Sequence, residues 1–189
     1  MTLALIDGDI VIYKAACAVE KEHRWPDGVW TYQADENEGI NYLTEKLQEI
    51  QDEIKATDTI ICLSDTEKNF RKHIYPDYKG NRTERKPLLF NFLRNYCLTH
   101  LSCCEYPFLE ADDVMGILAT SPDIEEDCII VTIDKDLLQI PAPVYNIDTK
   151  ELSQPLLRNP EMLFLEQVLV GDRVDNYPGC PGIGAKTVQ

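Results

Sequence analysis

The sequence lacks the features of a secreted or membrane-spanning protein. No apolar run approaches the roughly 18 residues that a transmembrane helix needs. The N-terminus has no basic start, long apolar stretch or small-residue cleavage site, so it does not indicate a signal peptide. Hydrophobic residues still make up 44% of the 189 residues, which excludes a fully disordered chain and suits one domain, or one domain and the start of a second. We therefore expect a cytoplasmic protein without a membrane partner.

The patterns of zinc sites and disulfide frameworks are also missing. The seven cysteines include no CxxC pair and most of them lie in apolar runs, so we interpret them as reduced core residues. His23, His73 and His100 are scattered without zinc-ligand spacing. No Ser–His or Cys–His pair is evident, and the sequence therefore does not predict catalysis by a covalent nucleophile.

Positive charge is scarce overall but concentrated in one segment. The chain has 18 Lys and Arg against 33 Asp and Glu, a net charge of −15, which by itself argues against a nucleic-acid partner. Residues 68–86, however, carry seven Lys or Arg against Asp77 and Glu84, a local charge of +5. Aromatic residues alternate with these cations, a mixture typical of surfaces that bind single strands. An ordinary solvated loop is the alternative.

Apolar runs alternate with stretches of helical periodicity along the chain. The runs predict strands at 3–6, 59–64, 101–106, 128–133 and 144–147. The periodic stretches predict helices at 10–19, 39–56, 88–96, 111–119 and 161–170. A Pro-Asp-Gly turn indicates a β-hairpin over 25–32. Alternating strands and helices predict an α/β fold with a mostly parallel sheet.

Acidic residues follow several of the predicted strands. Asp7, Asp65 and Asp134 stand at three strand ends, where parallel sheets form their sites. Each alone could instead be a turn or cap residue. Asp136 is two residues from Asp134, so in an extended segment both carboxylates would face one ion. Asp148 lacks such support, and we interpret it as a turn residue.

Two further acidic clusters complete the candidate site. Glu110, Asp112 and Asp113 stand at the start of a predicted helix, where helix capping is the alternative role. Asp172 and Asp175 are three residues apart, on one side of a helical turn. So many carboxylates repel one another unless cations compensate them. Oxygen ligands favour Mg²⁺ or Mn²⁺, and two such ions suit the hydrolysis of phosphodiesters.

The C-terminal residues are rich in glycine. Gly179 and Gly184 followed by Lys186 and Thr187 nearly form a P-loop, but Ala185 breaks the pattern and a helix precedes it. A turn at residues 182–184 between two helical segments fits better, and its backbone N–H groups could hold a phosphate. A plain helix connection is the alternative.

These motifs together resemble the 5′–3′ exonuclease/flap endonuclease family, especially the exonucleases of T7-like phages. The motifs are LIDGD (5–9), SD with FRK and YKGNR (64–82), EADDVMGILA (110–119), VTIDKDL (131–137) and GDRVDNYPGCPGIGAK (171–186). The resemblance implies a three-layer α/β/α PIN-like domain over 1–160, with a basic helical arch at about 66–95. It also implies the start of a helix–two-turn–helix duplex-binding element over 161–189.

The resemblance also implies roles for individual residues. The first metal's ligands would be Asp7, Asp65, Glu110 and Asp112, and the second's would be Asp134, Asp136, Asp172 and Asp175. Asp113 would support this metal-binding cluster, and Lys79 and Arg82 would contact the scissile phosphate. The other expected DNA contacts are Arg71, Lys72, Tyr78, Gly182, Gly184 and Lys186.

The expected cofactors are two Mg²⁺ or Mn²⁺ ions, with a monovalent cation at the 182–184 turn and no small-molecule cofactor. The expected partner is DNA with a 5′ end or flap, and the RNA strand of a hybrid is an alternative substrate. A phage-encoded protein would act in the host cytoplasm. Family members continue past this hairpin, whereas the sequence stops at Gln189. We therefore expect a fragment or an unusually short form, with weak duplex binding and an intact metal site.

Three other functions fit parts of the sequence. In a haloacid-dehalogenase-like phosphatase, Asp7 would be a covalent nucleophile and Asp9 an acid, but the acids at 110–113 and 134–136 would have no role. An inactive DNA-binding relative is a second alternative, although every motif carboxylate is present. An RNA-cleaving PIN protein is the third.

Overall fold

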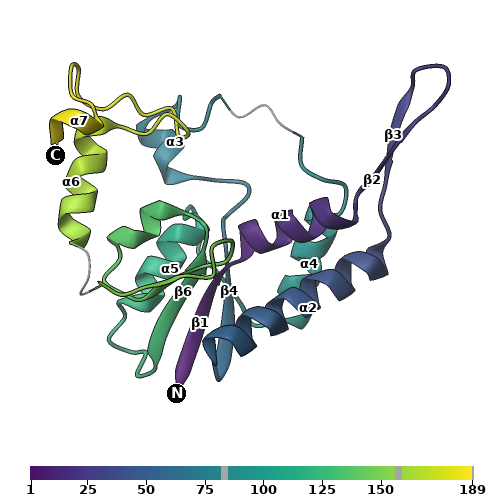
Figure 1. The fold of residues 1–189 in the computed structure, drawn as a ribbon, viewed down its shortest axis with the longest axis horizontal. Helices are drawn as coiled ribbons and strands as arrows, with labels where there is room; N and C mark the ends of the chain where they lie inside the picture. Colours follow the sequence, from purple (N-terminus) through teal and green to yellow (C-terminus); the bar gives the residue numbers. More distant parts are fainter. Residues whose placement is uncertain (82–84, 156–158, 189) are drawn as a thin grey trace.

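The computed structural model describes residues 1–81, 85–155 and 159–188. A six-stranded sheet lies at its centre, in the order β5-β4-β1-β6-β7-β8 (Figure 1). The strands are β1 (Thr2–Asp7), β4 (Asp58–Leu63), β5 (Cys103–Glu105), β6 (Asp127–Thr132), β7 (Val144–Asn146) and β8 (Leu152–Ser153). All neighbouring strands are parallel except β7 and β8. The predicted α/β fold is confirmed, whereas β8 was missed.

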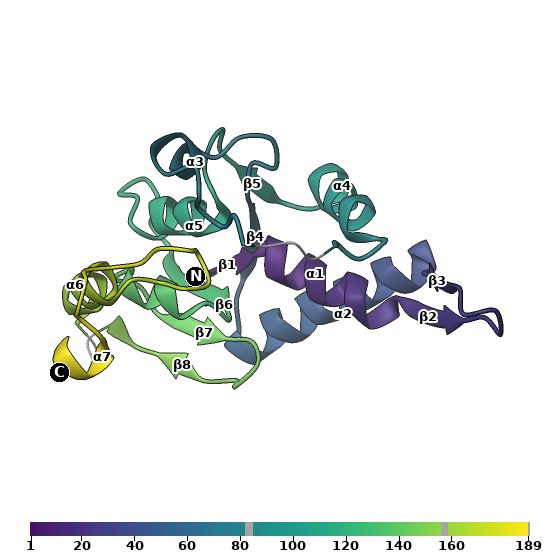
Figure 2. The same cartoon turned by 90° about the horizontal axis from the view of Figure 1, so that it is seen from above.

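Helices cover both faces of this sheet (Figure 2). One face carries α1 (Gly8–Val19), α2 (Glu36–Ile54) and α4 (Phe90–His100), and the other carries α5 (Ala111–Ala119). The remaining helices are α3 (Phe70–Ile74), the 3-10 helix η1 (Lys135–Gln139), α6 (Pro160–Val170) and α7 (Ala185–Val188). The domain thus has three layers, with helices on either side of the sheet.

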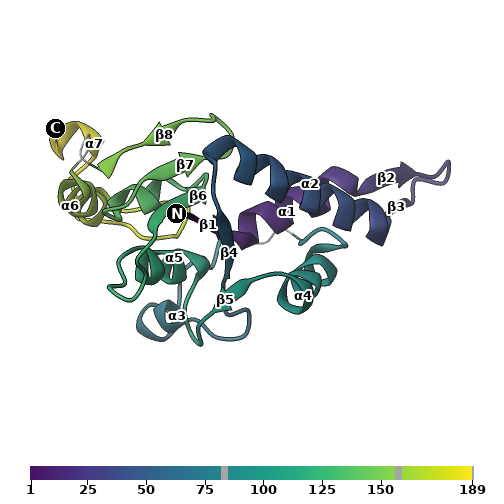
Figure 3. The ribbon, with the colours of Figure 1, turned by 90° about the horizontal axis from the view of Figure 1, so that it is seen from below.

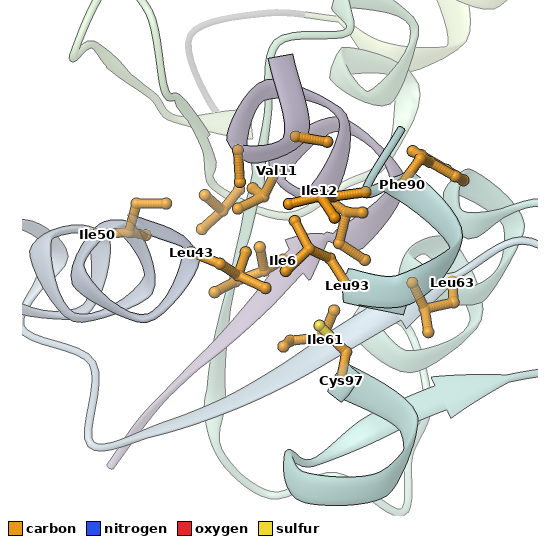
Figure 4. Close-up of a cluster of buried hydrophobic side chains, with 14 of the residues drawn as sticks. Ile6, Val11, Ile12, Leu43, Ile50, Ile61, Leu63, Phe90, Leu93 and Cys97 are labelled. Carbon is orange, nitrogen blue, oxygen red and sulfur yellow. The ribbon is translucent and has the colours of Figure 1, made fainter. Parts of the chain in front are cut away.

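The alternation of side chains along β1 explains the two hydrophobic cores. Ala4 and Ile6 face α1, α2 and α4, in the cluster shown in Figure 4. Leu3 and Leu5 point to the opposite face, toward α5. Successive residues of a strand face opposite sides, so a strand buried on both faces reads as a continuous apolar run. Continuous apolar runs therefore predict the central strands from sequence.

The order of the strands places a candidate site at one edge of the sheet. From β1 the chain extends outward through β4 to β5, and then crosses to the other side of β1 with β6 and β7. The winding direction therefore changes between β1 and β6. Parallel sheets bind ligands beyond the carboxyl ends of the strands at such a point. Asp7 ends β1, and Asp134 follows β6 by two residues.

Gly8 permits α1 to begin directly after β1. A Cβ atom on Gly8 would lie 2.5 Å from Cγ2 of Ile61 and 2.8 Å from the carbonyl oxygen of Cys62, which are distances that real Cβ atoms avoid. The Asp7 side chain caps the helix by accepting the N–H of Ile10 at 3.2 Å. The helix therefore starts two residues before the predicted position, and the glycine brings it against β4.

Several element boundaries differ from those predicted from sequence. The strand expected at 101–106 is only β5, and the helix expected at 88–96 is α4 over Phe90–His100. The basic segment begins with a short helix, α3, whose N-cap Asn69 accepts the N–H of Arg71 at 2.8 Å. Asn159 and Pro160 begin α6 as predicted, with Asn159 accepting the N–H of Met162 at 3.2 Å. Polar caps thus mark helix starts more accurately than apolar periodicity does.

The predicted β-hairpin is present and stands apart from the main sheet. Strands β2 (Lys21–Arg24) and β3 (Trp30–Gln33) pair only with each other, in an antiparallel register. The hairpin projects past the ends of α1 and α2 in all three ribbon views (Figures 1, 2 and 3). Every residue of both strands is exposed.

Within the described residues all seven cysteines are free, but only Cys62 and Cys97 are buried, and Cys17 is exposed. The expectation that most cysteines are core residues is therefore only partly right. None of the described helices is long and apolar enough to cross a bilayer.

Candidate active site

Asp7 lies in the interior at the end of β1. It is only 3% exposed, and its Oδ2 accepts a hydrogen bond from the Thr132 hydroxyl at 2.9 Å. Burial raises the pKa of Asp7 to about 7, although the bonds from Thr132 and Ile10 oppose this shift. A buried carboxyl with a raised pKa beside other acids marks a place where a cation would be stabilised. Sequence reasoning missed Thr132, because a threonine inside an apolar strand gives no functional signal.

Asp112 and Asp134 are close enough to Asp7 to affect its charge state. Asp112 stands in the first turn of α5, and its pKa is well above the usual range because of burial and of the charges of Asp7 and Asp134. Asp134 accepts the N–H of Asp136 at 2.9 Å and thereby caps η1. The expectation that 134–136 is extended is therefore wrong. The three carboxylates nevertheless lie close enough for their charges to act on one another.

Lys79 and Tyr78 bring the basic segment to Glu110. The Lys79 Nζ donates to Glu110 Oε1 at 2.9 Å and lies 4.0 Å from Asp175 Oδ1. The Tyr78 hydroxyl lies 2.8 Å from Glu110 Oε2 and 3.0 Å from Asp175 Oδ2. Burial alone would raise the pKa of Glu110, but Lys79 and Tyr78 outweigh it and lower the pKa. Lys79 thus supplies positive charge within the carboxylate cluster.

Asp113 supports the cluster through an ion pair. The Arg71 guanidinium donates two hydrogen bonds to Asp113, at 2.6 and 2.7 Å, and lies 3.6 Å from Glu110. Asp113 also accepts the backbone N–H of Glu110 at 3.0 Å. Burial alone would raise the pKa of Asp113, but Arg71 outweighs it and lowers the pKa. With these bonds Asp113 fits its expected supporting role, and the role of Arg71 as a DNA contact stays a prediction.

Asp136 and Asp172 form a second group of acids. The Gln167 side chain, from α6, donates to Asp136 Oδ2 at 2.6 Å. Burial raises the pKa of Asp136, and the charges of Asp134 and Asp172 add to this shift. Lys135 lies 4.0 Å from Asp172 but is largely exposed. Gln167 was not predicted, since a lone glutamine in an apolar helix carries no sequence signal.

A loop closed by two glycines holds Asp172 and Asp175. Gly171 and Gly179 both have positive φ, and a Cβ on Gly171 would lie 2.4 Å from the backbone nitrogen of Gly179. Asp172 pairs with Tyr177 in an isolated antiparallel bridge. Asp172 and Asp175 therefore lie in a tight turn rather than on one side of a helix. The close approach of the two backbones leaves no room for a side chain at either glycine.

The same loop contacts the basic segment, about 100 residues earlier in the chain. The backbone N–H of Lys79 donates to the Asp175 carbonyl at 3.1 Å. Asn81 and Tyr75 donate to the carbonyls of Arg173 and Asn176, at 3.2 and 3.1 Å. These bonds hold the basic segment against the loop that carries the second acidic group, and both border one space.

That space is a cavity of about 1030 Å³ between α3, α5, η1 and α6. Arg71 and Tyr78 line it with six carboxylates, which are Glu110, Asp112, Asp113, Asp136, Asp172 and Asp175. Apolar side chains line another part, including Ile74, Ile117 and Phe164. The cavity joins a charged region to an apolar one, a composition that suits a phosphate ester with an attached organic group.

Asp65 and Asp9 make contacts that the sequence did not predict. Asp65 accepts the backbone N–H groups of Glu67, Lys68 and Phe108 at 2.9 to 3.1 Å, which lower its pKa and shape the following loop. Asp9 interacts with Ser64 and Arg94, and burial raises its pKa. Asp65 is therefore held as a turn residue, and its role as a ligand stays a prediction. Asp148 is in a turn as expected and pairs with Lys14.

The other expected DNA contacts lie on the surface. Lys72 and Lys186 are exposed, as are Gly182 and Gly184. Gly182 has φ +80 and open space around its Cβ position, so its backbone conformation favours glycine. Arg82 lies outside the described residues. These assignments, like the division at residue 160, stay predictions.

The chemistry of the cluster fits divalent metal ions. All its candidate ligands are carboxylate oxygens, the donors that Mg²⁺ and Mn²⁺ prefer. Burial, together with the charges of neighbouring acids, raises the pKa values of Asp7, Asp112 and Asp136, and a bound cation would oppose these shifts. In the part of the chain that the structure describes, no three His, Cys, Asp or Glu side chains already form a closed ligand set. Small side-chain movements, with Lys79 leaving Glu110, would have to accompany binding.

Comparison with known proteins identifies the family of this chain. Residues 2–162 match the family model described as "5′-3′ exonuclease, N-terminal resolvase-like domain". The chain is 30% identical over 196 residues to an exodeoxyribonuclease of Enterobacteria phage T3, covering 96% of this chain and 63% of that protein. It is 31% identical over 205 residues to a 5′–3′ exonuclease of Bacillus subtilis (strain 168), covering 98% and 67%.

A solved structure shows the same fold. The bacteriophage T5 D15 flap endonuclease, in a pseudo-enzyme–product complex with DNA and metal ions, matches with a TM-score of 0.74 at 18% identity. The match covers all of this chain and 73% of that one. The chain thus spans 63% and 67% of the two relatives and 73% of this structure. Because the family model matches 161 of the 189 residues, the chain belongs to the 5′–3′ exonuclease family, by its N-terminal resolvase-like domain.

Proposed function

We propose that this chain carries the catalytic site of a divalent-metal-dependent 5′–3′ exonuclease and flap endonuclease, which hydrolyses phosphodiester bonds near the 5′ ends of DNA. The observation that carries the proposal is the cavity into which six carboxylates converge beside cations of the basic segment. Family membership and the names of the relatives support the same activity. The T5 neighbour was solved with both DNA and metal ions.

Two Mg²⁺ or Mn²⁺ ions are the proposed cofactors. Asp7, Glu110 and Asp112 would hold one ion, with Asp65 retained as a ligand on resemblance alone. The other ion would be held by Asp134, Asp136, Asp172 and Asp175. When bound, such ions make water nucleophilic at neutral pH and stabilise the leaving oxygen. Thr132 and Gln167 would orient Asp7 and Asp136, because each already donates a hydrogen bond to that carboxylate.

The basic segment would bind the substrate's phosphates. Lys79 now donates to Glu110, and it would turn to the scissile phosphate when metal compensates that acid. Arg82 would act beside it, and Lys72 would contact a phosphate farther along. Gly182, Gly184 and Lys186, with a monovalent cation at the turn, would hold the duplex backbone without reading its sequence. DNA is preferred over the RNA strand of a hybrid in this proposal because the named relatives include an exodeoxyribonuclease.

A covalent phosphatase is disfavoured by the position of Asp7. That side chain is 3% exposed and both its oxygens accept hydrogen bonds, so it is poorly placed to attack a substrate. Asp9, the acid in that mechanism, faces Ser64 and Arg94 instead. A small phosphate monoester should therefore not be hydrolysed.

The proposal is tested by digesting 5′-labelled duplex and 5′-flap DNA with and without Mg²⁺. The size of the first labelled product separates single-nucleotide release from flap cleavage. Asp134→Asn and Asp172→Asn should each slow cleavage by several orders of magnitude, since each removes a charge that holds metal. Asp148→Asn is the matched control, because that acid lies in a separate turn. Undiminished cleavage in excess EDTA, or wild-type rates in both site variants, would exclude the proposed site.

A further inference from the structure

The projecting β2–β3 hairpin exposes the chain's only two tryptophans. Trp25 and Trp30 are each 49% exposed, and both lie in this hairpin. Tryptophan gains much from burial, so an exposed pair on a projecting element indicates a contact surface. The catalytic site described above uses neither residue.

The two faces of the hairpin carry different side chains. On one face, the Trp25 indole donates to the Thr31 hydroxyl at 3.0 Å, and its ring meets that of His23 edge-on at 4.5 Å between centroids. These contacts give Trp25 a role within the hairpin itself. Trp30 pairs with Arg24 across the strands and therefore faces the other side.

That other side carries rings and cations, and we call Arg24, Trp30, Tyr32 and Arg85 the aromatic face. Glu22 lies on the same side opposite Tyr32 and accepts the Tyr32 hydroxyl at 3.0 Å. The guanidinium of Arg24 lies 5.1 Å from the Trp30 ring centroid, and that of Arg85 lies 3.7 Å from the Tyr32 centroid. Trp30 and Tyr32 are two residues apart on one strand, so their positions are about 7 Å apart. Arg85 also pairs with Glu20. The face therefore offers two neighbouring positions for stacking, one at Trp30 with Arg24 and one at Tyr32 with Arg85.

The basic segment that reaches the catalytic site also contributes Arg85 to the aromatic face. Lys79 of that segment contacts Glu110, and Arg85 near its end lies on Tyr32. Helix α1 leads from Asp7 to the base of the hairpin, and its 12 residues span about 18 Å. The carboxylates and the aromatic face therefore stand at opposite ends of one helix.

We propose that the aromatic face binds a single-stranded part of the nucleic-acid substrate, with one base stacked on Trp30 and the next on the Arg85–Tyr32 pair. Arg24 contacts the phosphate between them. Rings and guanidinium planes accept the faces of unpaired bases, which a duplex does not present. Cations over both rings favour a nucleic acid over an apolar protein surface. That the bound strand belongs to the substrate rests on the proposed nuclease function, whereas the binding of a single strand to this face does not.

The two tryptophans allow a direct test by intrinsic fluorescence. The whole chain is titrated in EDTA with an oligothymidylate of about 16 nucleotides, which is not cleaved under these conditions. Saturable quenching is expected, and it should persist in Trp25→Phe and largely disappear in Trp30→Phe. A blunt duplex should quench much less. No saturable quenching, or equal quenching in both variants, would overturn the proposal.

Affinity measurements separate stacking from hairpin stability. Trp30→Ala should weaken oligothymidylate binding about 5-fold to 150-fold, as expected for one stacked base. Arg24→Gln should weaken binding and flatten its salt dependence. Lys55→Gln is the charge-matched control, since Lys55 is exposed at the far end of α2. Equal losses in Arg24→Gln and Lys55→Gln would show that only net charge matters and would overturn the assignment to this face.

The cleavage assay with Mg²⁺ keeps the two proposals distinct. A chain that cleaves 5′-labelled DNA but shows no quenching refutes the aromatic face alone. A chain that shows Trp30-dependent quenching but no cleavage refutes the nuclease function and leaves the strand-binding surface intact. Self-association of the free chain that buries Trp30 and blocks oligothymidylate would identify a second copy as the occupant and overturn the proposal.

Discussion

At the scale of single residues, two cations compensate the acidic cluster in different ways. Arg71 makes two hydrogen bonds to Asp113, a geometry that fixes both groups. Lys79 makes one bond to Glu110 and stands 4.0 Å from Asp175, so a modest rotation would free it. We interpret Arg71 as structural and Lys79 as the cation that meets substrate.

The first prediction concerns Lys79. Replacing it with alanine should lower the cleavage rate on the order of 10²–10³-fold, by analogy with the loss of one preorganised electrostatic donor. Lys72→Ala is the matched control, because Lys72 is exposed and should mainly weaken binding and reduce its salt dependence. Single-turnover rates at several salt concentrations measure both effects. Equal, small losses in the two variants would indicate a merely solvated basic segment.

The second prediction follows from the buried acid Asp7. Its folded-state pKa is raised from 3.8 to about 7, so the folded chain holds a proton that the unfolded chain releases. The contribution of Asp7 to the free energy of unfolding is fully present below pH 3.8. It is lost as the pH rises toward 7, by up to about 4 kcal/mol. Without metal, the protein should therefore be less stable toward urea at pH 8 than at pH 5.5.

Asp7→Asn is the corresponding test, since asparagine keeps the shape and removes the titration. The stability difference between pH 5.5 and pH 8 should shrink in this variant when EDTA is present. Asp148→Asn should leave the difference as in the wild type, because that acid is exposed in a turn. An undiminished difference in Asp7→Asn would assign the pH dependence to other groups.

At the scale of elements, the features predicted from sequence are those with repeated or paired signals. β1, β4 and β6 are continuous apolar runs that end near aspartates, and α5 begins at an acidic cap. The two residues of β8 and the five of η1 are too short for periodicity to reveal. Contacts between distant segments, such as Gln167 with Asp136, leave no local pattern either. Sequence therefore identified most candidate acids, but not the residues that position them.

The third prediction concerns the loop that carries Asp172 and Asp175. Gly179→Ala should destabilise this loop, because the new Cβ would lie 2.4 Å from the carbonyl carbon of Val170 and the residue has φ +65. A cost of about 1–3 kcal/mol is typical of such strain. Thermal unfolding and the Mg²⁺ concentration needed for cleavage are the measurements.

Gly184→Ala is the matched control for stability. Gly184 has no atom within 4 Å of its Cβ position and no positive φ, so alanine should leave the melting temperature unchanged. A Gly179→Ala variant as stable as Gly184→Ala would show that the two backbones of the loop do not approach so closely in solution.

At the scale of the whole molecule, charge is separated rather than uniform. The chain carries −15 overall, yet residues 68–86 carry +5, and several residues between Phe70 and Tyr78 of this segment line the acidic cavity. A cluster of carboxylates costs stability in the folded state, where the acids are held together, and much less in the unfolded chain. Divalent ions should therefore act on the fold as well as on the chemistry.

The fourth prediction is that Mg²⁺ raises the melting temperature and is required for cleavage. An ion present at 100 times its dissociation constant adds about 2.7 kcal/mol of stability. For a chain of this size that corresponds to a rise of roughly 5–11 °C.

Ca²⁺ should also raise the melting temperature, because it too neutralises carboxylates. It should support little cleavage, since it is larger and tolerates looser geometry than Mg²⁺. Asp134→Asn should reduce both responses to Mg²⁺, and Asp148→Asn should reduce neither. If Mg²⁺ restores cleavage without any change in melting temperature, the ions do not bind the free protein and must enter with the DNA.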